Sequence, residues 1–262
     1  MSFASGSSGN CYYLGIGQQG ILVDAGAATR TIRKHLRDAG VAMEEIRAVF
    51  ITHDHADHIK GVASLGERLH IPIYATEKVH EGISRNYCVK ERLYTSARIL
   101  EKGTPLQIGD FQIEAFEVPH DGTDNVGYCI KADGQVFVFM TDLGCVPASA
   151  EPFVARANYL VLEANYDTEM LRTGTYPPYL KGRISGPRGH LSNTASAEFL
   201  ATHWHPGLRH VWLCHLSQEN NHPDLVLKTF ELRLKEAGIH VGQDLLLTPL
   251  KRTTPSEMYL LE

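Results

Sequence analysis

Short apolar runs recur along the chain, and several of them end in a histidine or an aspartate. The run Ile46–Thr52 is rich in β-branched residues and predicts a buried strand. Alternating polar and apolar residues predict another strand over Phe111–Val118. Two runs on either side of Asp133-Gly134 predict a β-hairpin, because this dipeptide favours a tight turn. The remaining predicted strands are Cys11–Ile16, Gly20–Asp24, Ile71–Ala75, Gly127–Ala132, Gln135–Thr141, Tyr159–Glu163, His210–Cys214 and Asp244–Thr248.

Helices are predicted in the segments between these strands. The clearest are Asn193–His203, for which Ser192 is a suitable N-cap, and the amphipathic segment Pro223–Ala237. Two β-containing halves, each with helices, follow one another without a linker. The pattern therefore predicts an α/β protein with two packed sheets and outer helices. Further helices are expected over Thr29–Ala39, from about 59 to 69, and over most of 77–98.

Composition narrows the class of protein but not its chemistry. The 262 residues are 43% hydrophobic, which is typical of a globular protein, and carry a formal net charge of −5. No overall basic surface indicates nucleic acid, although a local basic groove or bound metal ions can supply positive charge. Five scattered cysteines without a C-x-x-C pair indicate free thiols in a reducing cytosol. Since we find neither a signal peptide nor a transmembrane run, we expect a cytoplasmic protein without a membrane partner.

A histidine–aspartate cluster directly follows the predicted strand Ile46–Thr52. It reads His53-x-His55-x-Asp57-His58. Residues two apart share one face of a strand, and the loop beyond it can turn the next aspartate and histidine toward the same cavity. Three imidazoles and a carboxylate suit zinc, manganese or iron. The alternative is a polar loop that is rich in histidine by chance.

Three further ligand-type residues follow predicted strands. His120, Asp142 and His215 each come at the end of an apolar run. Because the ends of neighbouring strands converge on one rim of a sheet, we expect these side chains to meet. Together with the cluster they indicate a metal-dependent hydrolase. By contrast, His203 and His205 are two apart at the end of a predicted helix, so their side chains diverge and are not expected to share a metal.

These residues, taken together, resemble the metallo-β-lactamase superfamily over essentially the whole chain. The resemblance implies an αββα sandwich, two packed mixed sheets with outer helices, and a site for two divalent metal ions. It also implies that Asp24 supports the metal loops and that Asp57 is catalytic. The implied ligands are His53, His55 and His120 for one ion, Asp57, His58 and His215 for the other, and Asp142 as a bridge.

Local motifs favour the phosphodiesterase branch of this superfamily. Asp142 stands where zinc β-lactamases have a cysteine, and the Pro-Gly-His-Thr motif of thioesterases and lactonases is missing at His120. The segments around Glu163 and Gly189-His190 resemble those of tRNA 3′-processing nucleases. This resemblance implies that His190 is the general acid and Glu163 its partner, since an alkoxide leaving group needs a proton donor. The alternative for His190 is packing at a helix start.

The opening Ser5-Gly6-Ser7-Ser8-Gly9-Asn10 reads as a polar loop before the first strand. Ser7, Ser8 and Asn10 can form a phosphate-binding nest, with Arg188 as a further substrate contact; an ordinary turn or an expression-tag remnant is the alternative. With Thr-His-Asp-His-x-Asp-His and Gly-His-Leu-Ser-Asn, the loop resembles the YycJ (WalJ, VicX) family. That family implies a 5′-to-3′ exonuclease acting on DNA, with a role in DNA repair, and a single domain over 1–262 without a β-CASP insertion.

Two other functions remain open on the sequence. One is hydrolysis of a small ester, thioester or lactone, against which the missing Pro-Gly-His-Thr motif counts. The other is a non-catalytic, metal-binding regulatory protein.

Overall fold

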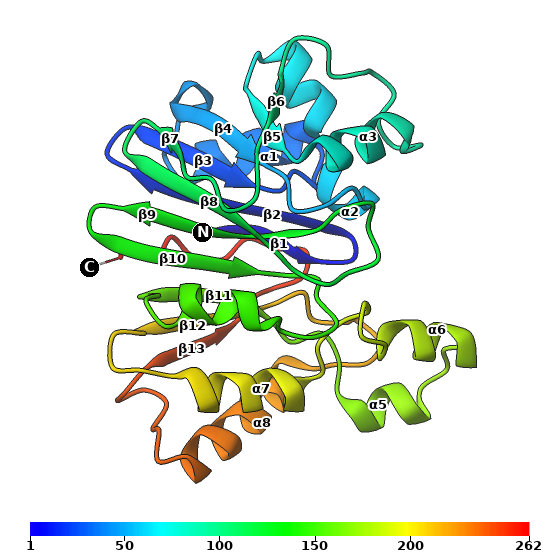
Figure 1. Cartoon of the computed structure of the whole chain (residues 1–262), viewed down its shortest axis with the longest axis vertical. Coiled ribbons are helices and arrows are strands. Elements are labelled where there is room, and N and C mark those ends of the chain that lie inside the picture. The colour runs from blue at the N-terminus through cyan, green and yellow to red at the C-terminus, as the bar shows by residue number, and fades with distance from the viewer. Residues whose placement is uncertain (262) are drawn as a thin grey trace. The chain divides into compact units, whose positions relative to one another are not determined.

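The computed structural model describes residues 1–261, which form two compact units (Figure 1). The first unit comprises residues 1–115 and 122–125 and the segment from Lys251 onward. The second comprises residues 116–121 and 126–250. Each unit contains β-strands, helices and a hydrophobic core of its own. The expected single domain without an insertion stays a prediction.

The first unit contains a mixed six-stranded sheet in the order β1-β2-β3-β4-β5-β6. Strands β1 to β3 are antiparallel, and β3 to β6 are parallel. Strands β7 and β8 pair antiparallel, and their residues as far as Ala115 belong to this unit. The bounds are β1 Ser2–Gly6, β2 Gly9–Ile16, β3 Gln19–Val23, β4 Ile46–Phe50, β5 Ile73–Ala75, β6 Ala97–Ile99, β7 Leu106–Ile108 and β8 Phe111–Glu117.

The helices of the first unit bury apolar residues at helical spacing. In α1 the buried residues are Ile32 and Leu36, four apart, and both join the core of the unit. Helix α3 begins at a side-chain cap, where the Thr76 hydroxyl accepts a hydrogen bond from the Val79 amide. The bounds are α1 Thr29–Asp38, α2 Ala56–Ile59 and α3 Glu77–Arg85, with a 3₁₀ turn over Met43–Glu45 and a π-helical turn over Ser64–Arg68.

The second unit contains the strands β9 to β13 in the order β13-β12-β11-β10-β9. Strand β9 is antiparallel to β10, and the other neighbours are parallel, so these strands too are mixed. The predicted hairpin is confirmed: Asp133 and Gly134 join β9 to β10 with φ values of 48° and 72°. The bounds are β9 Val126–Ala132, β10 Gln135–Met140, β11 Tyr159–Glu163, β12 His210–Cys214 and β13 Leu246–Pro249.

Two helices of the second unit, α7 (Asn193–His203) and α8 (Pro223–Glu236), pack on each other. The predicted cap of α7 is confirmed, because the Ser192 hydroxyl accepts a hydrogen bond from the Ala195 amide at 3.1 Å. Helix α8 buries Val226, Phe230 and Leu234. The shorter helices are α4 Glu151–Val154, α5 Thr168–Thr173 and α6 Pro178–Ile184, with a 3₁₀ turn over Ala148–Ala150.

Three sequence predictions are corrected here. Helix α3 ends at Arg85, so residues 86–96 are irregular and 97–99 form β6, where a helix was expected. The opening polar loop is a β-hairpin, in which Ser7 and Ser8 form the turn between β1 and β2. The helix expected from 59 to 69 is interrupted: α2 ends at Ile59, and helical structure resumes at residue 62 and continues through the π-helical turn Ser64–Arg68. All five cysteines are free, and among residues 1–261 no helix is long and apolar enough to cross a membrane.

Candidate metal centre and active site

The first unit gathers four of the seven predicted ligands. His53, His55, Asp57 and His58 follow β4, and α2 begins at Ala56. The ring of His53 lies 4.5 Å from that of His55 and 4.1 Å from that of His58, centroid to centroid. Nε2 of His58 lies 3.6 Å from Oδ2 of Asp57. Neighbouring pairs of these side chains therefore lie close enough to bind a common cation.

Asp24 orients one of these ligands, as the sequence predicts. It follows β3, is completely buried, and its Oδ2 accepts a hydrogen bond from Nδ1 of His58 at 2.7 Å. The amide of Thr52 donates to Asp24 at 2.8 Å, and the Thr52 hydroxyl donates at 2.9 Å. Burial raises the pKa of Asp24, and His58 and Thr52 offset part of that shift. With Nδ1 of His58 donating to Asp24, Nε2 carries the lone pair that a metal needs.

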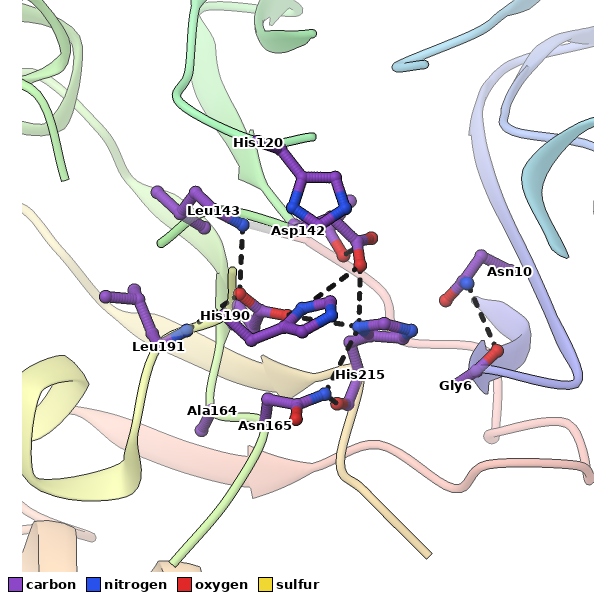
Figure 2. Close-up of polar contacts among 12 residues, drawn as sticks. Gly6, Asn10, His120, Asp142, Leu143, Ala164, Asn165, His190, Leu191 and His215 are labelled. Atoms are coloured by element: carbon purple, nitrogen blue, oxygen red, sulfur yellow. Dashed lines mark hydrogen bonds and ion pairs between the residues drawn. The ribbon is translucent and has the colours of Figure 1, made fainter. Parts of the chain in front are cut away.

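Asn10 approaches the same histidine from the other side. It is fully buried in β2, and its Nδ2 lies 2.9 Å from Nε2 of His58 and 3.3 Å from Oδ2 of Asp57. The same amide donates to the Gly6 carbonyl at 3.1 Å (Figure 2). Asn10, predicted as a substrate contact, therefore lies against two predicted metal ligands. Ser7 and Ser8, predicted with it, are exposed in the turn.

A glycine allows residues 53–58, which we call the metal-ligand loop, to lie against β2. A Cβ on Gly26 would lie 1.6 Å from the Asp57 carbonyl oxygen and 2.6 Å from the Asn10 amide nitrogen. The Gly26 amide donates to the Asn10 carbonyl at 2.7 Å. Both clashing atoms are backbone, so neither can move aside as a flexible side chain would. Gly26 is thus required for the close approach of these segments.

Asp54, which the sequence did not assign, anchors the metal-ligand loop to its neighbours. Its carboxylate accepts hydrogen bonds from the Thr123 amide at 2.9 Å and the Thr123 hydroxyl at 2.6 Å. Its carbonyl accepts a 2.8 Å hydrogen bond from the Asn86 side chain. The position of Asp54 between two histidines is the one available sequence signal for a supporting role.

The second unit gathers the other three predicted ligands with the predicted acid pair. Nδ1 of His215 lies 2.8 Å from Oδ1 of Asp142, and Nδ1 of His190 lies 3.5 Å from the same oxygen (Figure 2). The ring of His120 lies 5.0 Å from that of His190, centroid to centroid. Ligand atoms of Asp142, Glu163, His190 and His215 all lie within 4.8 Å of one another.

Glu163 is the buried acceptor at the centre of this group. Its Oε1 lies 2.7 Å from Nδ1 of His190 and 3.0 Å from Nδ1 of His215. Its Oε2 accepts hydrogen bonds from the amides of Leu143 at 3.0 Å and Leu191 at 3.1 Å. Burial raises the pKa of Glu163, but His190 and His215 outweigh burial, so the pKa lies below its usual value. An anionic Glu163 therefore joins the ends of β10, β11 and β12 to the segment that carries His190.

The remaining predicted residues lie beside this group. Nδ1 of His120 lies 2.8 Å from the Gly189 carbonyl, which leaves its Nε2 as the ligand atom. The exposed Arg188 donates from Nε to the His120 carbonyl at 3.0 Å. Asn165 is a residue that the sequence missed; its side-chain amide donates to the His215 carbonyl at 2.7 Å. No sequence signal distinguishes Asn165 from other polar residues that follow a strand.

Three residues of the candidate site, each of which follows a strand, adopt a left-handed backbone. Asp24 follows β3 with a φ of 60°, Asp142 follows β10 with a φ of 53°, and His215 follows β12 with a φ of 54°. Non-glycine residues seldom take this conformation, and it occurs preferentially at functional sites. The turn at each strand end is what aims the side chain.

The donor set fits divalent metal ions. Nδ1 of His58 and of His120 is held by an oxygen acceptor, so each ring offers Nε2 outward. Carboxylates accompany the imidazoles in both units, a mixture that suits zinc, manganese or iron. By contrast, His203 and His205 hydrogen-bond different backbone carbonyls, at 2.9 and 3.1 Å, and that they share no metal stays a prediction.

Comparison with known proteins places this architecture in a family. The model of the Beta-lactamase superfamily domain matches residues 19–215. The exodeoxyribonuclease WalJ of Streptococcus pneumoniae is 36% identical over 92% of this chain and 90% of its own length. The exodeoxyribonuclease YycJ of Bacillus anthracis is 32% identical over 92% of this chain and 90% of its own length.

A solved structure shares the fold. The metallo-β-lactamase fold protein YhfI of Bacillus subtilis matches with a TM-score of 0.67 at 18% identity, over 95% of this chain and 94% of that one. The fold prediction of two mixed sheets with helices is thereby confirmed. The chain is a metal-dependent hydrolase that belongs to the metallo-β-lactamase superfamily and, within it, to the family of the WalJ and YycJ exodeoxyribonucleases.

Proposed function

We propose that this chain is a dinuclear metal-dependent exodeoxyribonuclease that degrades DNA from the 5′ to the 3′ end. The observation that carries the proposal is the 36% identity to an exodeoxyribonuclease over 92% of the chain. The paired Glu163 and His190 support it, because a phosphodiester needs a proton donor for its leaving oxygen. A role in DNA repair in the cytoplasm is part of the proposal.

The proposed ligands of the two metal ions are those that the family resemblance implies. Such ions supply Lewis acidity toward a phosphoryl group and lower the pKa of water. The protein residues fix the direction of each ligand, through Asp24 on His58 and through the Gly189 carbonyl on His120. Asp57 is proposed as a catalytic ligand.

His190 is the proposed general acid. Its Nδ1 faces Glu163 at 2.7 Å, so Nε2 is the nitrogen that can donate a proton to the substrate. In the reaction a water molecule loses a proton to the solvent, its oxygen forms a bond to phosphorus, and the bond from phosphorus to the 3′-oxygen breaks. The 3′-oxygen leaves with the electron pair and takes the proton from His190. The Glu163 carboxylate stabilises the imidazolium before this transfer.

The test uses 5′-phosphorylated duplex DNA labelled at either end, with Mn²⁺ or Mg²⁺. We expect nucleotides to be released from the 5′ end by the wild type and not by Asp57→Ala. Release from the 3′ end would contradict the polarity. Absence of release, or equal release by Asp57→Ala, would contradict the nuclease, and rapid turnover of a thioester or lactone instead would favour the small-ester hydrolase.

A further inference from the structure

Helix α1 presents a row of cations on one face. Arg30, Arg33, Lys34 and Arg37 are spaced i, i+3, i+4 and i+7, which places them along one side of the helix. All four are exposed. None of these four residues is a proposed metal ligand or the proposed general acid.

This row is not neutralised by nearby acids. Asp38 is the one acidic residue of α1, and its carboxylate lies 3.5 Å from Arg37. Arg30, Arg33 and Lys34 form no ion pair with any residue in the range 1–261. Four cations and one acid within ten residues contrast with a chain whose formal net charge is −5. The local charge therefore favours an anionic partner.

A groove of about 750 Å³ runs along these side chains; we call it the α1 groove. The four cations line it together with the hydroxyl-bearing residues Thr29, Thr31 and Ser64 and the apolar residues Val41, Ala42 and Met43. Glu44 is its one acidic lining residue. Cations interleaved with hydroxyl groups provide the donors that phosphate oxygens accept.

The α1 groove begins close to the metal-ligand loop of the same unit. The Ala25 amide donates to the His58 carbonyl at 2.8 Å, and the Gly61 amide donates to the Ala25 carbonyl at 2.7 Å. The Thr29 hydroxyl, at the start of α1, donates to the Gly61 carbonyl at 3.4 Å. From Arg30 to Arg37 the helix rises by about 10 Å. Measured along the duplex axis, one DNA strand carries a charge every ~3.4 Å, so this length matches about three phosphates when α1 lies along that axis.

We propose that the α1 groove binds the sugar-phosphate backbone of the DNA substrate, away from the bond that is cut. The identity of the ligand as DNA rests on the proposed function. The contacts are with phosphates, so they increase affinity without reading the base sequence.

The test compares the wild type with Arg33→Gln/Lys34→Gln/Arg37→Gln. A matched control, Lys228→Gln/Lys235→Gln/Lys251→Gln, removes the same three charges from exposed positions outside α1. We expect the α1 variant alone to raise KM for duplex DNA at least tenfold, with kcat and the turnover of bis(p-nitrophenyl) phosphate unchanged. Thermal unfolding of both variants verifies that they fold.

Salt dependence gives a second readout. Each lost phosphate contact reduces the slope of log(kcat/KM) against log[salt] by about 0.9, so three contacts reduce it by about 2.7. Between 50 and 200 mM salt, the wild type should therefore lose about 40-fold more activity than the α1 variant. Equal KM and equal slopes for the wild type, the α1 variant and the control would overturn the proposal. If the wild type cleaves no DNA, the nuclease assignment fails, and fluorescence anisotropy with the same duplex then measures the slope of log affinity against log[salt]. A steeper slope for the wild type than for the α1 variant would still support the α1 groove.

Discussion

Nδ1 of His190 faces the buried carboxylate of Glu163 at 2.7 Å, and the His190 side chain is only 17% exposed. Removing the imidazole removes the proton donor and one partner of the buried Glu163, whose Oε2 keeps the amides of Leu143 and Leu191. We predict that His190→Ala lowers kcat for DNA by about 10²- to 10⁴-fold. The kcat for the p-nitrophenyl ester of thymidine 5′-monophosphate should fall less than tenfold, because its leaving group needs no proton. Equal losses on both substrates would show that His190 acts on binding or metal retention instead.

Asp24 holds His58 through a 2.7 Å hydrogen bond to Nδ1. We predict that Asp24→Asn lowers the affinity for Zn²⁺ or Mn²⁺ by about 10- to 100-fold, because the ligand loses its charged orienting partner. Competition with a chromophoric chelator measures this affinity. Asp38→Asn, at an exposed position of α1, is the control and should bind metal as the wild type does. Unchanged affinity in Asp24→Asn would remove its supporting role.

Gly26 lies where a methyl group would meet the Asp57 carbonyl oxygen at 1.6 Å. We predict that Gly26→Ala lowers the free energy of unfolding by about 3 kcal/mol, since the backbone must move to admit the methyl group. Urea unfolding checks this prediction. Gly182→Ala is a matched control in α6, where nothing lies within 4 Å of the added Cβ, and it should not destabilise the protein. A Gly26→Ala variant as stable as Gly182→Ala would contradict the close approach.

His210 makes stability depend on pH. Burial lowers its pKa from 6.5 to about 4, and its Nε2 lies 2.8 Å from the Thr248 hydroxyl. The His210 imidazole binds a proton near pH 6.5 in the unfolded chain but only near pH 4 in the folded chain. The stability that the neutral imidazole contributes is therefore complete above pH 6.5 and is lost as the pH falls toward 4. We predict that, between pH 7 and 4.5, the free energy of unfolding falls by on the order of 2 kcal/mol less for His210→Gln than for the wild type. Urea unfolding at several pH values measures the difference, and parallel curves would contradict it.

Much of the candidate site was predictable because ligands follow strands. The rule that strand ends converge on one rim needs only the apolar runs, and these runs are enough to locate Asp142 and His215. The hairpin at Asp133-Gly134 and the cap at Ser192 were predictable because both depend on neighbouring residues.

Features that depend on distant residues were not predictable from local pattern. The segment after Arg85 is irregular because the Asn86 side chain bonds to Asp54, and Glu67 accepts hydrogen bonds from the Thr95 and Ser96 amides at 3.1 and 3.0 Å. The pKa of Glu67 is lowered to about 2, chiefly by the Ser96 hydroxyl. Strand β1 was missed because its serines and glycine favour turns, whereas pairing with β2 makes it a strand. Asn10 and Asn165 contact ligands 48 and 50 residues away in the sequence.

The left-handed turns at Asp24, Asp142 and His215 each place a side chain in a backbone conformation that costs about 1 kcal/mol and that glycine adopts without penalty. At Asp24, glycine would also leave the buried donors of Thr52 and His58 without their acceptor, which costs more than the strain that it relieves. A library of variants selected only for resistance to heat should therefore retain Asp24, so the retention of this residue is by itself no record of selection for cleavage.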